Sequence, residues 1–512
     1  MPAAALSGLE AISLSIEVHI TRGIKFFLVG MPDSAIRESK HRIYSALRAS
    51  NYKWPGQRIT INLAPANVKK EGSAYDLPIA LAILHASKQQ PMPKLPSVLC
   101  IGELSLTGEL RTVRGIYTMV EWALQEGISA VVLPESDAYL AQFFPKLLFF
   151  PCKTISAAVN VVQQLEDLSP AQQKDLSRMA VIEALDNAIL MAKKRVRTNA
   201  HLSDPSLLHQ KGKCFTDVKG QQTLKRALFL SAAGGHHCYI QGPPGVGKTM
   251  LLRRMPGLLP ALNFAERKAL APIRSASAHL DETPLLTGQR PFEFNGTSLT
   301  KLQLLGKPEY GPGALASAHL GFLVFEDFHA TSTSIQYALH TPLDEAQSGG
   351  IPAMTTLLIT ANPCKCGNFG HPTKRCSCTA SSLHAYTEKL CGPFKDRIDI
   401  HIMVTNPIEG TSGIRLSTVQ MRERVATARE FQRQRWGGEI LNAFADALPT
   451  DSRWGLTSQA KARLEDAATE LGMSERAKRK LLGLARTIAD LEAQTNIRAP
   501  HMEEALRYRP LG

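Results

Sequence analysis

A glycine-rich run near the middle of the chain, Gly242 to Thr249, has the residue types and the spacing of a phosphate-binding loop. Glycines at this spacing let backbone N–H groups surround phosphate oxygens, a lysine reaches the β- and γ-phosphates, and a hydroxyl coordinates Mg²⁺. In this sequence the last two groups belong to Lys248 and Thr249. The residues that we expect to bind ATP are Gly242, Pro243, Pro244, Gly245, Val246, Gly247, Lys248, Thr249 and Met250.

Two acids and an amide follow later apolar segments. Glu326 and Asp327 come directly after the apolar residues 321–325, and Asn362 comes shortly after the apolar run 355–360. Buried strands of this kind place carboxylates beside a phosphate-binding loop, where they hold Mg²⁺ and activate the attacking water. We expect the amide of Asn362 to orient that water.

Four of the nine cysteines lie between residues 364 and 378. They form two Cys-x-Cys pairs separated by residues 367–375, and such pairs can place four thiolates around one ion. A closed shell of four sulfur atoms favours a structural role for the metal. The expected zinc ligands are Cys364, Cys366, Cys376 and Cys378. Free or buried thiols are the alternative interpretation, and His371 is a substitute ligand.

The elements around the loop must place it between a strand and a helix. We predict a short strand over His237 to Gln241 and a helix that opens at Lys248. From Phe215 onward, short apolar segments alternate with helical ones, which is typical of an α/β nucleotide-binding domain.

The two ends of the chain have different patterns. Residues 12–20 alternate strictly between apolar and polar, which predicts a strand with one buried face, and helical patterns follow at 34–49 and 77–86. After Pro407 the pattern is almost wholly helical, which predicts a small helical lid. One face of that lid is predicted from the spacing of Leu481, Leu484, Ile488 and Leu491.

Length and charge limit the interpretation further. A chain of 512 residues exceeds what one core usually organises, so several domains are expected. The longest apolar runs are far shorter than the ~20 residues of a membrane helix, and the first residues lack the basic start of a secretion signal. We therefore expect a cytoplasmic protein. A net charge of +14 and a pI near 9.3 favour an anionic partner such as DNA or RNA.

Motifs along nearly the whole chain resemble those of the magnesium-chelatase-like AAA+ proteins of the ComM/YifB family. They are found at residues 29–39, 61–66, 70–78, 215–221, 242–249, 362–367, 392–399 and 485–491. The resemblance implies an α/β fold, namely a P-loop AAA+ parallel-sheet core with an α-helical lid, preceded by an α+β Lon-protease-like (S5-like) domain. The implied domains are 1–165 (Lon-like, inactive), 166–212 (helical and basic linker), 213–407 (ATPase core with the cysteine cluster) and 408–512 (helical lid).

The same resemblance implies roles for individual residues. Asn362 corresponds to the sensor-1 residue, Arg397 to an arginine finger that reaches a neighbour's nucleotide, and Arg476 to the sensor-2 arginine. A guanidinium in such a position stabilises charge that develops on the γ-phosphoryl oxygens. The sequence departs from the family at the acids, because the usual order is Asp then Glu. We therefore expect Glu326 to face Mg²⁺ and Asp327, one methylene shorter, to stand in the place of the base.

The resemblance also implies the function of a bacterial hexameric ring ATPase that acts on DNA. ComM is similar to a branch-migration helicase that extends donor DNA into the chromosome by homologous recombination during natural transformation, so recombination proteins are further expected partners. Two alternatives remain: a metal-chelatase-type motor subunit, and an ATP-binding scaffold or switch with weak hydrolysis, which the reversed acids favour. A Lon-type protease needs a lysine to activate a serine. The position of the catalytic serine falls near Ser73 or Ala74 in this sequence. The catalytic lysine is expected in residues 116–119, and these contain no lysine.

Overall fold

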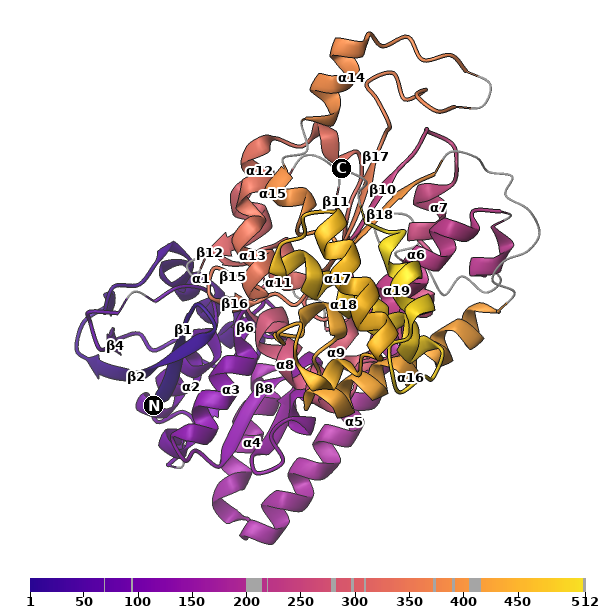
Figure 1. Cartoon of the computed structure of the whole chain (residues 1–512). Helices are drawn as coiled ribbons and strands as arrows, with labels where there is room; N and C mark the ends of the chain where they lie inside the picture. The colour runs from indigo at the N-terminus through magenta and orange to yellow at the C-terminus, as the bar shows by residue number, and fades with distance from the viewer. Residues whose placement is uncertain are drawn as a thin grey trace. The chain divides into compact units, whose positions relative to one another are not determined.

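The computed structural model describes residues 1–68, 70–93, 95–198, 214–218, 220–277, 282–295, 299–307, 310–371, 374–388, 392–404 and 416–509. The chain divides into two units, whose elements are labelled in Figure 1. The amino-terminal unit consists of Met1–Thr198, Arg267–Thr287 and Lys307–Gly311. The carboxyl-terminal unit consists of Asn199–Glu266, Gly288–Gly306 and Pro312–Gly512. No helix within the described ranges is both long enough and apolar enough to cross a membrane.

The amino-terminal unit is an α+β structure with two main sheets. The predicted strand at residues 12–20 is confirmed, since it lies inside β2, whose buried side chains Leu14 and Ile16 alternate with polar ones. The first sheet has the order β1 (Pro2–Ser7), β2 (Glu10–Thr21), β4 (Arg58–Ala64), β3 (Phe26–Val29). The second is parallel, with the order β5 (Val98–Cys100), β8 (Ala130–Pro134), β9 (Leu148–Cys152). A short pair joins β6 (Glu103–Leu104) to β7 (Leu110–Arg111).

The helices of this unit follow the sequence pattern closely. Helix α1 (Ser34–Ala49) has the predicted bounds, because Asp33 caps it by accepting a hydrogen bond from the Ile36 backbone N at 2.8 Å. Helix α2 (Asp76–Ala86) also matches its prediction and is buried on every side from Asp76 to Leu84. The remaining helices that begin before residue 200 are α3 (Ile116–Gln125), α4 (Ile155–Asp167) and α5 (Pro170–Thr198).

The segment Arg267–Thr287 belongs to the amino-terminal unit although it follows the phosphate-binding loop in sequence. Ser275 ties it to the start of α3: its backbone O accepts from Gly115 N at 2.7 Å and its Oγ accepts from Tyr117 N at 2.9 Å. The guanidinium of Arg114 donates to the backbone O of Ala276 at 2.8 Å. These bonds satisfy buried backbone groups that would otherwise cost free energy.

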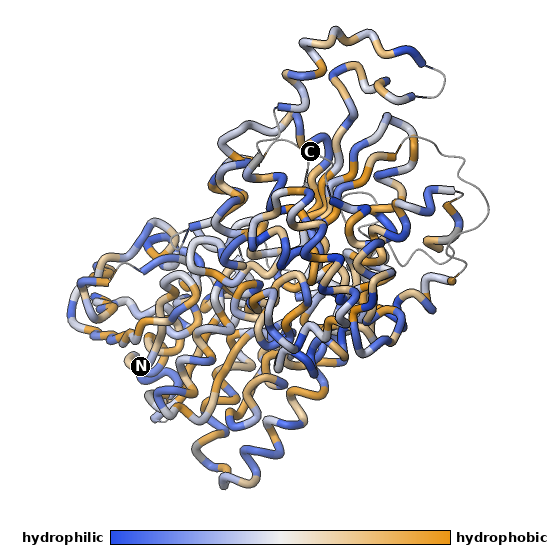
Figure 2. The backbone as a smooth tube through the Cα atoms, viewed as in Figure 1, coloured by the Kyte–Doolittle hydropathy of each residue, from blue (hydrophilic) through white to orange (hydrophobic). Residues whose placement is uncertain are grey.

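The carboxyl-terminal unit is built on a parallel sheet of five strands, which confirms the predicted P-loop AAA+ core. The order is β11 (Phe292–Asn295), β14 (Phe322–Phe325), β17 (Thr356–Ala361), β10 (Cys238–Gln241), β18 (Ile400–Met403). Every residue of β14 and β17 is buried, and Figure 2 shows hydrophobic colour along these central strands. The carboxyl ends of β10, β14 and β17 therefore lie side by side.

Most of the described residues that follow β18 are helical, as the sequence predicts. The helices are α16 (Thr418–Trp436), α17 (Ser458–Glu470), α18 (Glu475–Leu491) and α19 (Ala499–Leu506). The predicted apolar face of α18 is confirmed, because Leu481, Leu484, Ile488 and Leu491 are all buried.

An ion pair with a buried carboxylate attaches α18 to the sheet. Lys480 Nζ donates to Asp399 Oδ1 at 3.1 Å, and Asp399 Oδ2 accepts from the backbone N of His237, next to β10, at 2.9 Å. Burial opposes ionisation of Asp399, but Lys480 and His236 hold its pKa well below the ordinary value. The carboxylate thus connects the start of β10, the start of β18 and the helical region.

The α-helices and β-strands not yet named follow in chain order. They are α6 (Gln222–Gly234), α7 (Lys248–Leu252), α8 (Phe264–Ser275), α9 (Thr283–Thr287), α10 (Lys301–Leu305), β12 (Gly306–Lys307), β13 (Gly311–Pro312), α11 (Ala314–Ser317), α12 (Thr333–Ala338), α13 (His340–Glu345), β15 (Gln347–Ser348), β16 (Ile351–Pro352), α14 (Ala380–Thr387) and α15 (Gly392–Lys395).

Candidate functional site

The phosphate-binding loop connects β10 to α7, as its sequence predicts. Gly247 has a φ of +91°, a left-handed conformation that favours glycine, and it directly precedes α7. At Gly242 a Cβ atom would lie 2.7 Å from the backbone O of Val404, so only glycine fits between the loop and the residue after β18. The backbone of the loop is therefore free of side chains where phosphate oxygens would approach.

The ammonium group of Lys248 lies inside the loop. It donates hydrogen bonds to the backbone O of Gly242 at 2.5 Å and of Pro243 at 2.9 Å, and the side chain is buried. Burial lowers the pKa of Lys248, while the nearby carboxylates of Asp327 and Glu326 oppose that shift. The structure thus places both acids close enough to the lysine to act on its charge.

The four polar side chains predicted around the loop are brought together by neighbouring strands. The hydroxyl of Thr249 donates to Glu326 Oε1. The amide Nδ2 of Asn362, which follows β17, donates to Asp327 Oδ1 at 3.2 Å. Hydroxyl and carboxylate oxygens are the ligands that Mg²⁺ prefers, and an amide beside a carboxylate can orient a water. The pairing of Glu326 with Thr249 fits the expected Mg²⁺-facing position of that acid.

The backbone at Asp327 gives a physical reason for the unusual order of the two acids. Asp327 has a φ of 48° and a ψ of 45°, which is the left-handed region. Asn and Asp enter this region more readily than other residues with a side chain, since their short polar groups interact locally. Asp therefore fits this position with less strain than Glu.

The two predicted arginines lie together on one carboxylate. Arg397 holds Asp344 with two hydrogen bonds, from Nε at 3.1 Å and from Nη2 at 2.6 Å. Arg476 Nη2 lies 3.1 Å from the same Asp344 Oδ2. Neither guanidinium forms a hydrogen bond or ion pair with the loop residues 242–249 of its own chain, within the described ranges. Sequence reasoning missed Asp344, and no local pattern around it signals that it receives both arginines.

The four predicted cysteines also come together. Their sulfur atoms all lie within 4.8 Å of one another, and three of the separations are 3.3, 3.6 and 3.8 Å. Tetrahedral Zn–S bonds of ~2.3 Å place the sulfur atoms ~3.8 Å apart, so this cluster fits one zinc ion. The backbone N of Phe369 donates to Cys364 Sγ at 3.3 Å, so the loop backbone holds this sulfur in position. His371 is outside the cluster, and its Nδ1 accepts from Lys374 N at 3.0 Å.

The Lon-like region lacks a comparable convergence. The hydroxyl of Ser73 donates to Glu103 Oε2. Residues 116–119, where a Lon-type lysine is expected, form the first turn of α3 and are all buried. The buried ammonium of Lys70 donates to the backbone O of Pro65. A serine hydroxyl bonded to a carboxylate has no lysine to activate it in this arrangement.

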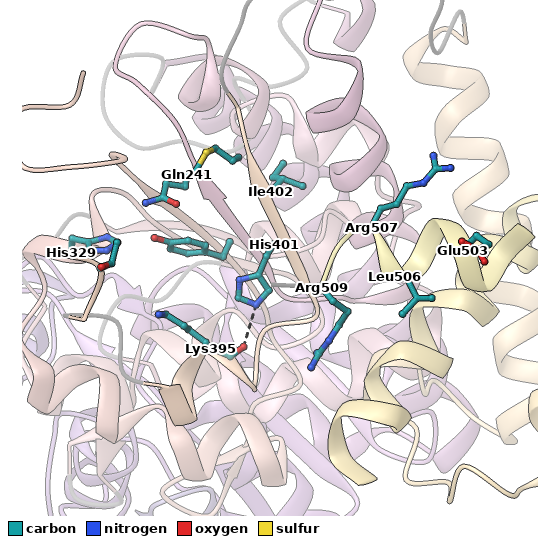
Figure 3. A pocket seen from close by; sticks show the side chains of 12 residues that line it. Gln241, His329, Lys395, His401, Ile402, Glu503, Leu506, Arg507 and Arg509 are labelled. Atoms are coloured by element: carbon teal, nitrogen blue, oxygen red, sulfur yellow. Dashed lines mark hydrogen bonds between the residues drawn. The ribbon is translucent and has the colours of Figure 1, made fainter. Parts of the chain in front are cut away.

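A cavity of about 770 Å³ lies beside β10 and β18, and Figure 3 shows its lining. Three cations face it, namely Lys395, Arg507 and Arg509, while the acid Glu503 is held by Arg463 at 2.7 Å. Burial lowers the pKa of His401 in this cavity to about 4, so that ring is neutral. No residue of the loop 242–249 is among the twelve that line the cavity, although Gln241, directly before the loop, is one of them.

Comparison with known proteins covers almost the whole chain. Family models match residues 214–411 (magnesium chelatase, subunit ChlI), 16–137 (subunit ChlI of Mg-chelatase) and 415–509 (magnesium chelatase, subunit ChlI C-terminal). The uncharacterized protein YifB of Escherichia coli is 32% identical over 522 residues, which cover 98% of this chain and 95% of YifB. The competence protein ComM of Haemophilus influenzae is 32% identical over 521 residues, which cover 98% of this chain and 96% of ComM. The Lon protease of Magnetococcus marinus is 27% identical over 122 residues, which cover 23% of this chain and 15% of that protease.

Proposed function

Because this chain belongs to the magnesium-chelatase-like AAA+ family of YifB and ComM, we propose that it is an ATP-driven ring motor that acts on DNA. The observation that supports this most is the meeting of Lys248, Thr249, Glu326, Asp327 and Asn362 at one edge of a parallel sheet. Ligands bind at this edge in α/β proteins of this class. ATP is the expected nucleotide.

Each of these residues has a proposed part in hydrolysis. Lys248 binds the β- and γ-phosphates, and Thr249 with Glu326 would hold Mg²⁺. The metal ion, when bound, neutralises charge on the phosphates. Asp327 accepts the proton of the attacking water, and the amide of Asn362 keeps that water in line.

The two arginines complete a site in a neighbouring subunit. Arg397 and Arg476 are turned toward Asp344 instead of toward their own phosphate-binding loop. We therefore assign both to the edge that meets the next subunit, where Arg397 acts as the finger and Arg476 as the sensor-2 arginine. Such a shared site requires an interface between neighbouring subunits, and a closed homo-hexameric ring is the assembly that we propose.

The proposed substrate is single-stranded or branched DNA. The net charge of +14 supports a polyanionic partner, and the relative ComM is a competence protein. We propose the ComM-like role of branch migration in homologous recombination during natural transformation. The cysteine cluster is proposed to hold one structural Zn²⁺, and the Lon-like region to be an inactive relative of the protease, used for assembly or DNA contact.

A second candidate is an ATP-binding scaffold or switch with weak hydrolysis, which the short carboxylate of Asp327 favours. A metal-chelatase-type motor subunit is a third candidate, since the matching family models carry that description. The discriminating measurement is ATP turnover of the wild-type chain with and without single-stranded DNA, with Lys248→Ala as the background. Turnover that DNA stimulates supports the motor. Tight ATP binding without turnover above the Lys248→Ala level would exclude the motor and support the switch.

A further inference from the structure

The segment that contains the cysteine cluster has an unusual surface charge. We define the cysteine module as residues 364–371 and 374–387. Its cations Lys365, Lys374 and Arg375 are exposed, and none of them forms an ion pair within the described ranges. Between Asn362 and Thr387 the sequence contains no Asp or Glu. The positive charge of the module is therefore not compensated within it.

The module also exposes an aromatic ring and most of a helix. Phe369 is 46% exposed. Helix α14 buries none of its residues, and in Figure 1 it projects away from the sheet of its unit. A helix normally buries one face against its own unit. The exposed faces of α14 and Phe369 are thus available to a partner.

Further cations lie near the last residue of α14, although the exposed acid Glu388 follows it directly. That last residue, Thr387, lines the cavity of Figure 3 together with Lys395, Arg507 and Arg509. The Nη1 atom of Arg509 is buried and has no hydrogen-bond partner within the described ranges. A long anion that crosses the module can therefore meet further donors in the cavity.

We propose that the cysteine module is a contact for single-stranded nucleic acid. Lys365, Lys374 and Arg375 bind backbone phosphates, and a base stacks on Phe369. The zinc ion holds these groups in one arrangement, since the short module has little core of its own. An acidic protein segment would satisfy the charges but would leave the exposed ring without a planar partner. This inference rests on the proposed action on DNA and names the surface that performs it.

Residues at the base of the module contact the residues proposed for hydrolysis, so nucleic acid bound at its tip can affect them. Asn362 lies two residues before Cys364, and it bonds to Asp327. A Cβ atom on Gly367 would lie 3.1 Å from the ring of Pro244 in the phosphate-binding loop. Tyr386 of α14 stacks on His329, two residues after Asp327, with ring centroids 4.2 Å apart and planes inclined by 4°. Nucleic acid held on the module is therefore expected to stimulate hydrolysis.

The test compares two variants with the same change in net charge. The module variant is Lys365→Glu, Lys374→Glu, Arg375→Glu, and the control is Lys88→Glu, Lys146→Glu, Lys461→Glu, three exposed lysines elsewhere. Binding of a fluorescent oligothymidine is measured by anisotropy over a series of salt concentrations, with equal zinc content in each protein. The module variant should lose about 2 units of the slope of log affinity against log salt, since each phosphate contact on a single strand contributes ~0.7. The control should keep the wild-type slope.

Two further measurements separate the outcomes. Phe369→Ala should weaken binding about tenfold, and Phe369→Trp should restore it, because stacking needs an aromatic face. Polyglutamate should displace the fluorescent oligothymidine far less well than unlabelled oligothymidine does at equal charge. Equal displacement would contradict the inference and indicate an acidic protein as the partner. If wild type binds DNA and the module and control variants lose the same slope, this inference is wrong while the proposed function stands. If wild type binds no DNA in any salt, the proposed function itself fails.

Discussion

Two buried lysines, Lys70 in the Lon-like region and Lys248 in the phosphate-binding loop, have similar surroundings at short range. Each donates to backbone carbonyl groups of its own loop, and burial lowers the pKa of each. The difference is the charge nearby. Glu326 and Asp327 oppose the pKa shift of Lys248, whereas burial lowers the pKa of Lys70 with no opposing carboxylate among the described residues. A buried lysine is therefore not a catalytic signal unless strand ends bring carboxylates to it.

The hydroxyl groups of the two regions extend this comparison. Thr249 donates to Glu326, and Ser73 donates to Glu103, so a hydroxyl–carboxylate pair exists in both. Around Thr249, the adjacent residue Lys248 and the acid Asp327, which follows β14, add two further charges. In the Lon-like region the charged pair is structural, because Arg42 holds the buried Asp76 with bonds of 2.6 and 3.0 Å. Among the described residues, similar short-range pairs therefore occur in both regions, and only the phosphate-binding loop adds a second carboxylate beside its lysine.

The largest effect that tests the comparison is expected at Arg397. Arg397→Ala should lower ATP turnover about 1000-fold, because a finger stabilises charge on the transferred phosphoryl group. The measurement is turnover of Arg397→Ala mixed with Lys248→Ala, since some mixed interfaces contain an intact lysine and an intact arginine. Partial recovery is expected. If the two variants co-assemble, wild type is active and no recovery occurs, Arg397 does not act across the interface.

The next effect concerns the reversed acids. Combining Glu326→Asp with Asp327→Glu restores the order usual in the family and should raise turnover, since a carboxylate misplaced by ~1 Å can cost ~100-fold. The left-handed backbone at residue 327 opposes part of the gain, because it disfavours Glu. The single variant Asp327→Glu is the matched control. A double variant that is no faster than wild type would show that the roles of the two acids are assigned wrongly.

A smaller effect is expected at the cysteine cluster. Protein purified without chelator should contain one zinc ion per chain, and Cys376→Ser with Cys378→Ser should remove it. Turnover should fall about tenfold, because residues around a metal site that orient catalytic groups typically matter by ~10–100-fold. Cys152→Ala, at a thiol in β9 outside the cluster, should keep the metal. Metal analysis without stoichiometric zinc in wild type would rule the site out.

The smallest effect is expected at Ser73. Ser73→Ala should leave ATP turnover and DNA binding unchanged and should lower the free energy of unfolding by about 1 kcal/mol, the typical net value of one hydrogen bond. Thermal unfolding and turnover measure the two effects. If wild type cleaves casein or peptides and Ser73→Ala abolishes this cleavage, the Lon-like region is an active protease. That result would contradict the contrast drawn between the two regions.

Much of the fold and the inner part of the site follow from local sequence pattern. Helix α1 has its predicted bounds, because a cap and a repeat of about 3.6 residues are encoded within a few positions of one another. The loop before Lys248, the acids after β14 and Asn362 after β17 were predicted in the same way, since apolar runs identify strands and parallel strands end at one edge. The four cysteines were found from spacing alone, although their metal stays a prediction.

Only the tertiary structure decided which distant residues meet. Asp344 receives Arg397 and Arg476, Gly367 packs on Pro244, and Arg267–Thr287 joins the amino-terminal unit. These contacts join residues that are far apart along the chain, and no repeat of 2 or about 3.6 residues relates them. Local pattern states which face of an element is buried, but the packing of whole elements selects what lies against it.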